Sequence, residues 1–353
     1  MFKNSKEAKH IHKLLKRTIV SPEAFYKWSN NEPEELSKTL APLNNYITHH
    51  APSKLYKMRT ASDMAFDALE KDKLYLTRAD YFNDPYDCFL TFDIEKLKSL
   101  ILRNLSDEKM SHFIANSGIP LPIGDDFPTV DAILKVFRSK RAEFLEKCAS
   151  ILPDVTVELQ KNTYVASLTE NIISPVMWAH YANNHKGFAI EYQFRTDMFS
   201  PHPIITPDKG LTWHGWKSIL PVYYSKNRLD GSSLAEWFAL CKWWNTLCVD
   251  KKIDCDMSNY LPDLLLKTKL CLQKSMEWAY EREWRLTIAN NWPNHIGAES
   301  AHIFYPPTGI YLGERISSQN SMRLKEIAQE KNIPVYQMYI DHSGKEYKME
   351  VHI

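Results

Sequence analysis

One short segment constrains the fold of this chain more than any other: Trp278-Ala279-Tyr280-Glu281-Arg282-Glu283-Trp284-Arg285-Leu286-Thr287-Ile288. Successive side chains of a β-strand point to opposite faces. The pattern therefore predicts a strand with an ionisable face, made by Glu281, Glu283, Arg285 and Thr287, and a mostly apolar face, made by Arg282, Trp284, Leu286 and Ile288. Burying the ionisable face costs free energy unless its groups are paired or line a cleft. The alternative is a solvated sheet face with Glu–Arg pairs.

The charge balance and the missing glycine motifs exclude several classes of protein. The chain has 353 residues, with 44 Lys and Arg against 43 Asp and Glu, and its formal net charge is +1. This balance gives no global field that would favour nucleic acids or anionic membranes, although a local basic groove is compatible with it. The 10 Gly form neither a Gly-x-Gly-x-x-Gly nor a Gly-x-x-x-x-Gly-Lys-Ser/Thr motif. A Rossmann fingerprint and a P-loop are therefore not expected.

Cysteine spacing and hydropathy indicate the compartment. None of the 6 Cys forms a Cys-x-x-Cys pair, so no metal site is expected. The first residues lead into a charged helical pattern without an apolar signal region, and no run of apolar residues is long enough to span a membrane. These features predict a soluble, cytoplasmic protein without a membrane contact. They do not predict its oligomeric state.

The arrangement of predicted elements indicates the fold class. Residues 1–50 read as a helical N-terminal extension, and residues 51–353 as a single α+β domain with helical insertions near 95–160 and 228–277. Strands and helices come in uneven groups, without a β-α-β rhythm, which favours a mixed or antiparallel sheet. The predicted strands cover 54–59, 73–77, 164–168, 187–192, 220–224, 281–288, 302–304, 309–312, 333–337 and 347–352, and the predicted helices include 62–71, 232–277 and 318–331.

A short helix is predicted from the segment Ser174-Pro175-Val176-Met177-Trp178-Ala179-His180-Tyr181. Ser174 is a suitable N-cap, and proline is favoured at the first helical position. Trp178 and Tyr181 are three residues apart and share a face, whereas His180 lies to one side. Two interpretations remain for the aromatic pair, which are packing in the core and stacking on a planar ligand.

Two further segments are candidates for ligand contact. Phe82-Asn83-Asp84-Pro85 is first a turn, because Asn and Asp bond local backbone and proline fixes φ. It follows a strand directly, so Asn83 could also rim a cleft. Arg59, near Tyr56 in the first predicted strand, is either a surface charge or an anchor for a phosphate, whose oxygens suit the guanidinium fork.

Taken in order, these motifs resemble a known family. They are Leu55-Tyr56-Lys57-Met58-Arg59, Phe82-Asn83-Asp84-Pro85, Ser167-Leu168-Thr169-Glu170, Met177-Trp178-Ala179-His180-Tyr181 with Asn184-His185-Lys186-Gly187-Phe188, and Tyr280-Glu281-Arg282-Glu283-Trp284-Arg285. Over roughly residues 54–340 they look like the largely prokaryotic domain of unknown function 2971 family. The resemblance implies no reaction.

A second, looser resemblance does imply a reaction. Mono-ADP-ribosyltransferases of the arginine–serine–glutamate type present an arginine on the first strand, a Ser-x-Ser/Thr-like strand and a Glu-x-Glu strand, and the chain is similar at Arg59, at Ser167 with Thr169, and at Glu281 with Glu283. The resemblance implies an ADP-ribosyltransferase-like sheet and an enzyme that consumes NAD. It makes Glu283 and Glu281 catalytic, with Glu283 stabilising an oxocarbenium-like transition state. The expected NAD-binding residues are Arg59, Tyr56, Ser167, Thr169, Trp178, His180, Tyr181, Asn83 and Arg285.

Three functions follow as alternatives. The preferred one is an ADP-ribosyltransferase-like enzyme that acts on a protein or nucleic-acid acceptor, and families of this kind are often toxins or phage-defence effectors. The second is a non-catalytic module that binds a nucleotide or nucleic acid through an aromatic and basic cleft. The third is a metal-free hydrolase with Glu283 and His180 as its acid–base pair.

Overall fold

The computed structural model describes residues 5–19, 34–97, 152–161, 163–194, 199–206, 210–232, 265–289 and 300–352, together with a few single helical positions between 99 and 150. Most of the helical insertions predicted near 95–160 and 228–277 lies outside these residues. The helices are α1 (Lys6–Arg17), α3 (Glu34–His50), α4 (Asp63–Glu70), α9 (Leu152–Lys161), α10 (Pro175–Tyr181), α12 (Leu266–Leu270) and α13 (Ser318–Lys331), with the 3-10 helices η1 (Ala79–Tyr81) and η3 (Met276–Glu281). The strands are β1 (Leu55–Arg59), β2 (Lys73–Arg78), β3 (Thr163–Thr169), β4 (Phe188–Tyr192), β5 (Phe199–Thr206), β6 (Gly210–Pro221), β7 (Tyr223–Ser225), β8 (Gln273–Ser275), β9 (Glu283–Ala289), β10 (Ser300–Phe304), β11 (Gly309–Leu312), β12 (Val335–Ile340) and β13 (Met349–His352).

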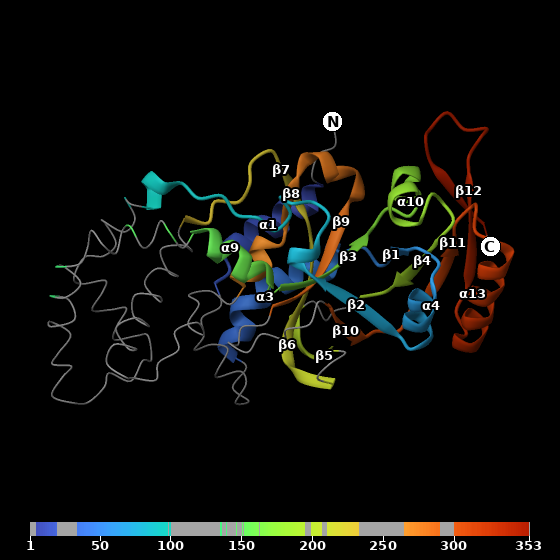
Figure 1. Cartoon of the computed structure of the whole chain (residues 1–353), viewed down its shortest axis with the longest axis horizontal. Helices are drawn as coiled ribbons and strands as arrows, with labels where there is room; N and C mark the ends of the chain where they lie inside the picture. Colours follow the sequence, from blue (N-terminus) through green and yellow to red (C-terminus); the bar gives the residue numbers. More distant parts are fainter. Residues whose placement is uncertain are drawn as a thin grey trace.

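Most described strands belong to one curved sheet (Figure 1). Within the described residues, 11 strands follow the order β13-β12-β11-β4-β1-β3-β2-β10-β5-β6-β9, and β3 also pairs with β9. This extra pairing closes β3, β2, β10, β5, β6 and β9 into a ring, and β1, β4, β11, β12 and β13 continue the sheet outside the ring as a wing. Only the β11–β12 pairing is parallel among the described pairs of this sheet, and β7 and β8 form a separate parallel pair. The predicted α+β class is thus confirmed.

Strand β3 has one continuous edge and one divided edge. Along the first edge, β9 pairs from Thr163–Ala289 to Thr169–Glu283. The second edge is shared, because β1 pairs with β3 only at Tyr56–Thr169 and β2 pairs with it only near Val165. Residues 166–168 therefore have no strand partner on that edge among the described residues, and the sheet opens there.

The main hydrophobic core joins the N-terminal helices to the sheet. Ser5 caps α1 by accepting a hydrogen bond from the Ala8 amide. Ile11 of α1 and Leu43 of α3 are fully buried in the same cluster as Leu286 of β9. Burying one such side chain contributes about 1.5–3 kcal/mol. The two helices predicted as an N-terminal extension therefore share the core of the sheet.

Helix α10 is held close to β1 by a tight turn. Its N-cap Ser174 accepts a hydrogen bond from Met177 N, and the turn that follows contains consecutive left-handed residues at Asn183, Asn184 and His185. A Cβ at Gly187 would lie 2.1 Å from the carbonyl oxygen of Arg59. Glycine is thus required at this position by the close approach of two backbones.

Two predictions, one about the acidic segment and one about the residues before it, were wrong. The strand predicted over 281–288 begins only at Glu283, because Arg282 has a left-handed backbone with φ of 44° and ends η3. Glu281 therefore lies on a 3-10 turn and not on the strand. The long helix predicted over 232–277 is also replaced, where the structure describes it, by α12, β8 and the start of η3. The β5–β6 hairpin was not predicted.

No helix among the described residues is long and apolar enough to cross a membrane. Helix α13 packs against β11, a strand of this wing, and against α4 (Figure 1).

Candidate active site

A pocket with several ionisable side chains opens beside the divided edge of β3. Its cavity volume is about 190 Å³. Residues from β1, from the loop after η1, from β3, from α10 and from the segment 274–283 line it; they are Tyr56, Lys57, Met58, Phe82, Asn83, Asp87, Ser167, Leu168, Thr169, Met177, Tyr181, Lys274, Glu281 and Glu283. The pocket thus unites segments that are far apart in the sequence.

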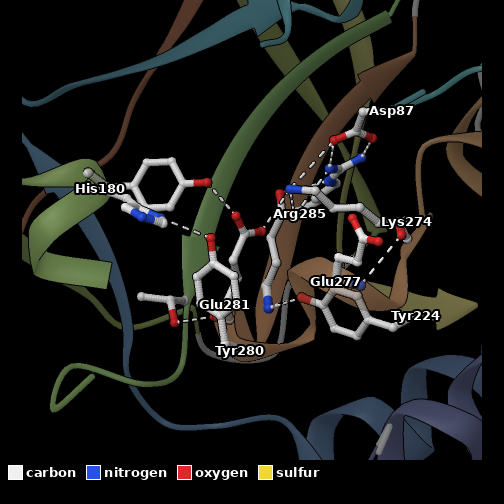
Figure 2. Close-up of polar contacts among 12 residues, drawn as sticks. Asp87, His180, Tyr224, Lys274, Glu277, Tyr280, Glu281 and Arg285 are labelled. Atoms are coloured by element: carbon white, nitrogen blue, oxygen red, sulfur yellow. Dashed lines mark hydrogen bonds and ion pairs between the residues drawn. The ribbon is translucent and has the colours of Figure 1, made fainter. Parts of the chain in front are cut away.

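Arg285 lies buried beneath the acidic residues of this pocket and organises them (Figure 2). Its Nε donates to Glu283 Oε1 at 2.8 Å, and its Nη1 donates to Asp87 Oδ1 at 2.8 Å and to the Cys271 carbonyl oxygen at 2.5 Å. Its Nη2 donates to Asp87 Oδ2 at 2.5 Å and to Glu283 Oε2 at 3.1 Å. All five N–H groups of the guanidinium therefore have acceptors. Arg285 holds the site together and has no donor left for a ligand.

Lys274 connects the two glutamates. Its Nζ lies 2.7 Å from Glu281 Oε2, 3.2 Å from Glu283 Oε2 and 3.6 Å from Asp87 Oδ2. Burial lowers the pKa of Lys274, but the attraction of Glu283 and Glu281 outweighs burial and raises the pKa above its ordinary value. Lys274 is therefore a permanent cation at neutral pH.

The pKa values of Glu281 and Glu283 are shifted in opposite directions, although both carboxylates pair with Lys274. Burial and the repulsion of Glu283 raise the pKa of Glu281 from 4.5 to about 7. Burial also favours the neutral form of Glu283, but Arg285 and Lys274 outweigh it and hold the pKa of Glu283 well below its usual range. Carboxyl groups whose pKa values are driven apart by their surroundings are typical of acid–base sites.

Three hydroxyl groups fix the two glutamates. The Tyr181 hydroxyl group donates to Glu281 Oε1, and burial followed by the charge of Glu281 raises the pKa of Tyr181. Thr169 Oγ1 donates to the Glu281 carbonyl oxygen at 2.6 Å, and the Glu283 amide donates to the Tyr224 hydroxyl oxygen at 2.8 Å. Both acidic residues are therefore positioned through their backbone as well as through their side chains.

The aromatic helix contributes Tyr181 to the pocket but not Trp178. Trp178 is fully buried, its indole N–H donates to the Ile172 carbonyl oxygen at 2.7 Å, and it packs with Met177. The packing interpretation therefore holds for Trp178, because no face of its ring is open to a ligand. His180 does not line the pocket, and its Nδ1 lies 3.0 Å from the Tyr280 hydroxyl oxygen (Figure 2).

Of the remaining predicted residues, Tyr56, Asn83, Ser167 and Thr169 line the pocket, whereas Arg59 does not. Arg59 interacts electrostatically with Tyr75 and Tyr192, and burial lowers its pKa. Along β1 it shares a strand face with Lys57, and of these two residues only Lys57 lines the pocket. A phosphate anchor at Arg59 is therefore not part of this pocket.

The sequence interpretation missed three ionisable pocket residues: Lys57, Asp87 and Lys274. Lys57 is a charged residue between Tyr56 and Met58, and Asp87 lies two residues after the Asn-Asp-Pro turn. For both residues, the available signal was a charged side chain in a segment that was otherwise predicted to be a strand or a turn. Lys274 had no such signal, because it was predicted to lie within a long helix.

The fold and the pocket define an α+β protein with a buried cluster of ion pairs at a candidate catalytic site. Residues 177–286 match the model of a family described as protein of unknown function (DUF2971). The match falls within the range 54–340 that resembled this family in sequence and includes Tyr181, Lys274 and both glutamates. The chain matches no curated protein and no solved structure. These comparisons give the predicted likeness to mono-ADP-ribosyltransferases no support.

Proposed function

We propose that the protein is an enzyme that cleaves the N-glycosidic bond of an NAD-type nucleotide, with Glu281 as its general base. The proposal is carried by one observation: two glutamates that pair with the same lysine have pKa values shifted in opposite directions. A pKa near 7 suits a group that must be partly ionised and still able to accept a proton at neutral pH. Glu281 meets this condition and borders the pocket.

The charge of the cluster favours a cationic substrate. The two cations are shared among three carboxylates, so one negative charge is in excess when Glu281 is ionised. Lys57 adds at most part of a positive charge, because burial and Arg59 lower its pKa to about 7. A pyridinium ring such as that of nicotinamide carries the complementary charge.

The two glutamates have different roles in the proposed reaction. The bond between C1′ of the ribose and the ring nitrogen breaks, and nicotinamide leaves with the electron pair as a neutral molecule. The oxygen of water or of an acceptor hydroxyl bonds to C1′, and its proton goes to Glu281. Glu283, fixed as an anion by Arg285 and Lys274, contributes negative potential while positive charge develops on the ribose.

The size of the pocket limits what enters it. Ligand pockets usually enclose about 300–1,000 Å³, whereas this pocket has about 190 Å³. The nicotinamide ring with part of its ribose suits this volume better than a whole dinucleotide does. The remaining nucleotide would lie outside the pocket. An ADP-ribosyltransferase-like role as a toxin or phage-defence effector is the broader form of this proposal, and it predicts that expression in bacteria depletes cellular NAD.

A second candidate is a binding module without catalysis. It is favoured by the complete pairing of Asp87, Glu283 and Arg285, an arrangement that also suits a purely structural role. In that case the pocket would recognise a nucleotide ring with Tyr56 and Phe82 as its aromatic residues.

The experiment that separates these functions measures nicotinamide release from NAD by the purified protein. Glu281→Gln should lower kcat by about 100-fold or more if Glu281 is the base. Glu277→Gln is the matched control, because Glu277 lies on the same 3-10 helix but is exposed, and it should keep wild-type turnover. Binding of NAD without release by the wild-type protein, with water or any added acceptor, would favour the binding module.

A further inference from the structure

Two lysines line the pocket in contrasting surroundings. Lys274 has three carboxylates within ion-pair distance. Lys57 has none among the described residues, and its Nζ donates one hydrogen bond, to the carbonyl oxygen of Ser167 at 2.9 Å. One pocket thus contains a lysine held as a cation and a lysine held by a neutral acceptor.

The divided edge of β3 explains the position of Lys57. Ser167 belongs to the segment 166–168, which has no strand partner on that edge within the described residues. The amine of Lys57 reaches the opening and gives Ser167 the hydrogen bond that a strand would otherwise supply. A neutral amine can donate this bond and keep its lone pair, whereas an ammonium ion in the same place has no lone pair.

The charges around Lys57 favour the neutral amine. Burial contributes most, Arg59 on the same strand repels a second positive charge, and together they lower the pKa of Lys57 from 10.5 to about 7, against a weaker attraction from Glu283. A lysine that is desolvated beside another cation is the common setting of a nucleophilic amine.

We infer that Lys57 is a nucleophilic amine that captures the carbonyl carbon of a small hydroxylated aldehyde or ketone as a Schiff base. The nitrogen lone pair of Lys57 bonds to the carbonyl carbon, and the carbonyl oxygen becomes a hydroxyl group. Loss of this oxygen as water, with two protons, then forms the C=N bond, so no oxidant or reductant takes part. The Asn83 side chain lies in the same pocket and offers polar atoms to the hydroxyl groups of such a ligand, and the Tyr181 hydroxyl oxygen, whose hydrogen is donated to Glu281, can still accept a hydrogen bond.

This inference goes beyond the proposed function and does not depend on it. A merely structural Lys57 would seal the sheet edge and react no faster than other lysines. The two roles differ in a rate that can be measured without any activity assay.

The test uses glycolaldehyde as the probe and cyanoborohydride to trap the imine on the full chain. Mass spectrometry of chymotryptic peptides then gives the labelling rate of each lysine. Near pH 7, Lys57 should be labelled about 10-fold or more faster than the exposed Lys325, whereas Lys274 should stay unlabelled. Equal or slower labelling of Lys57 in the folded protein would overturn the inference.

The pH dependence provides the second readout. The labelling rate at Lys57 should rise with a midpoint near pH 7, as its pKa of about 7 requires. The charged and titratable groups that face it are Tyr56, Arg59, Asp87, Tyr181, Lys274, Glu281 and Glu283. Glu281 titrates in the same range, so the measurement is repeated with Glu281→Gln. The labelling should persist there although the proposed turnover is lost, and loss of the labelling would overturn the inference, because the reactivity would then depend on Glu281 and not on the surroundings of Lys57 alone.

Two variants complete the design. Lys57→Arg retains a donor for the Ser167 carbonyl oxygen but has no nucleophilic amine, so the adduct on this peptide should vanish. Adduct at another pocket residue in that variant would contradict the assignment. If Lys57→Arg does not fold, the labelling ratio in the wild-type protein decides alone.

Discussion

The Tyr181 hydroxyl group donates a hydrogen bond to Oε1 of Glu281, and the two residues are separated by 100 positions in the chain. The other oxygen, Oε2, lies 2.7 Å from Lys274 Nζ. One neutral donor and one cation therefore hold the same carboxyl group. Burial and the repulsion of Glu283 outweigh these two contacts and raise the pKa of Glu281 to about 7, where either protonation state is available.

Glu281→Gln should change how stability depends on pH. Burial raises the pKa of Glu281 from 4.5 to about 7, so between these values the folded protein keeps a proton that the unfolded chain has released. This contribution is fully present below pH 4.5 and is lost as the pH rises through 7. Gln imitates the protonated form. The wild-type protein should therefore lose up to about 3 kcal/mol of unfolding free energy relative to the variant between pH 4.5 and about 8, measured by urea denaturation.

Glu277→Gln is the control for that comparison, because Glu277 is exposed on the same 3-10 helix. Its difference from the wild-type protein should stay constant with pH. A constant difference for Glu281→Gln as well would mean that Glu281 titrates at its ordinary pKa.

Arg285→Met should destabilise the protein strongly. The change removes the cation shared by Asp87 and Glu283, both of which are buried. Removing one partner of a buried ion pair costs about 3–5 kcal/mol, because the other charge is left without compensation. Differential scanning calorimetry or urea denaturation would measure the loss.

Arg323→Ala offers a matched comparison. Arg323 also contacts two carboxylates, those of Asp63 and Glu70, but its side chain is 40% exposed. Surface pairs contribute about 0–1 kcal/mol, so this variant should remain near wild-type stability. Similar losses for the two arginine variants would contradict the organising role of Arg285.

Trp178→Ala should act on stability and not on ligand binding. Trp178 is fully buried and its indole N–H is bonded to Ile172, so truncation should cost about 3–5 kcal/mol. Val176→Ala on the same helix is the control, because Val176 is 44% exposed, and it should cost less than about 0.5 kcal/mol. An unchanged melting temperature together with a loss of nucleotide affinity in Trp178→Ala would contradict this prediction and indicate that the Trp178 ring contacts the ligand.

Gly187→Ala should loosen the contact between β1 and the turn after α10. The new Cβ would lie 2.1 Å from the Arg59 carbonyl oxygen and 3.0 Å from that of Ala182. Because both neighbours are backbone atoms, the strand itself must move, at a cost of about 1–3 kcal/mol or more. Gly309→Ala is the control, since its nearest contacts are at 3.5 Å. Equal thermal stability of the two variants would contradict this prediction.

Local patterns predicted most of the elements in the described part of the chain. The alternation after Glu283 indicated β9, and Ser174 with Pro175 indicated the start of α10, because both signals depend on a few neighbouring residues. The left-handed residue Arg282 was not predicted, since nothing in a Glu-Arg-Glu sequence distinguishes a kink from a strand. The β5–β6 hairpin was missed as well.

The site was harder to predict than the elements around it. Tyr181 and Glu281 were both selected, but their contact depends on how α10 packs against η3. Arg59 was selected and Lys57 was not, although they are two residues apart on β1. The choice between them depends on where the neighbouring strands separate, and that separation has no local signature in the sequence.

The left-handed Arg282 gives the two glutamates unequal mechanical support. Glu283 begins a strand that is bonded on both sides, to β3 and to β6. Glu281 ends η3, a 3-10 helix of 6 residues, and is anchored by Thr169 at its carbonyl oxygen. Amide hydrogen exchange should therefore be slow along β9 and faster in η3, because short turns open at a lower free energy than central strands. Of the two glutamates, Glu283 is thus the one whose backbone the sheet holds more rigidly, although both side chains are paired.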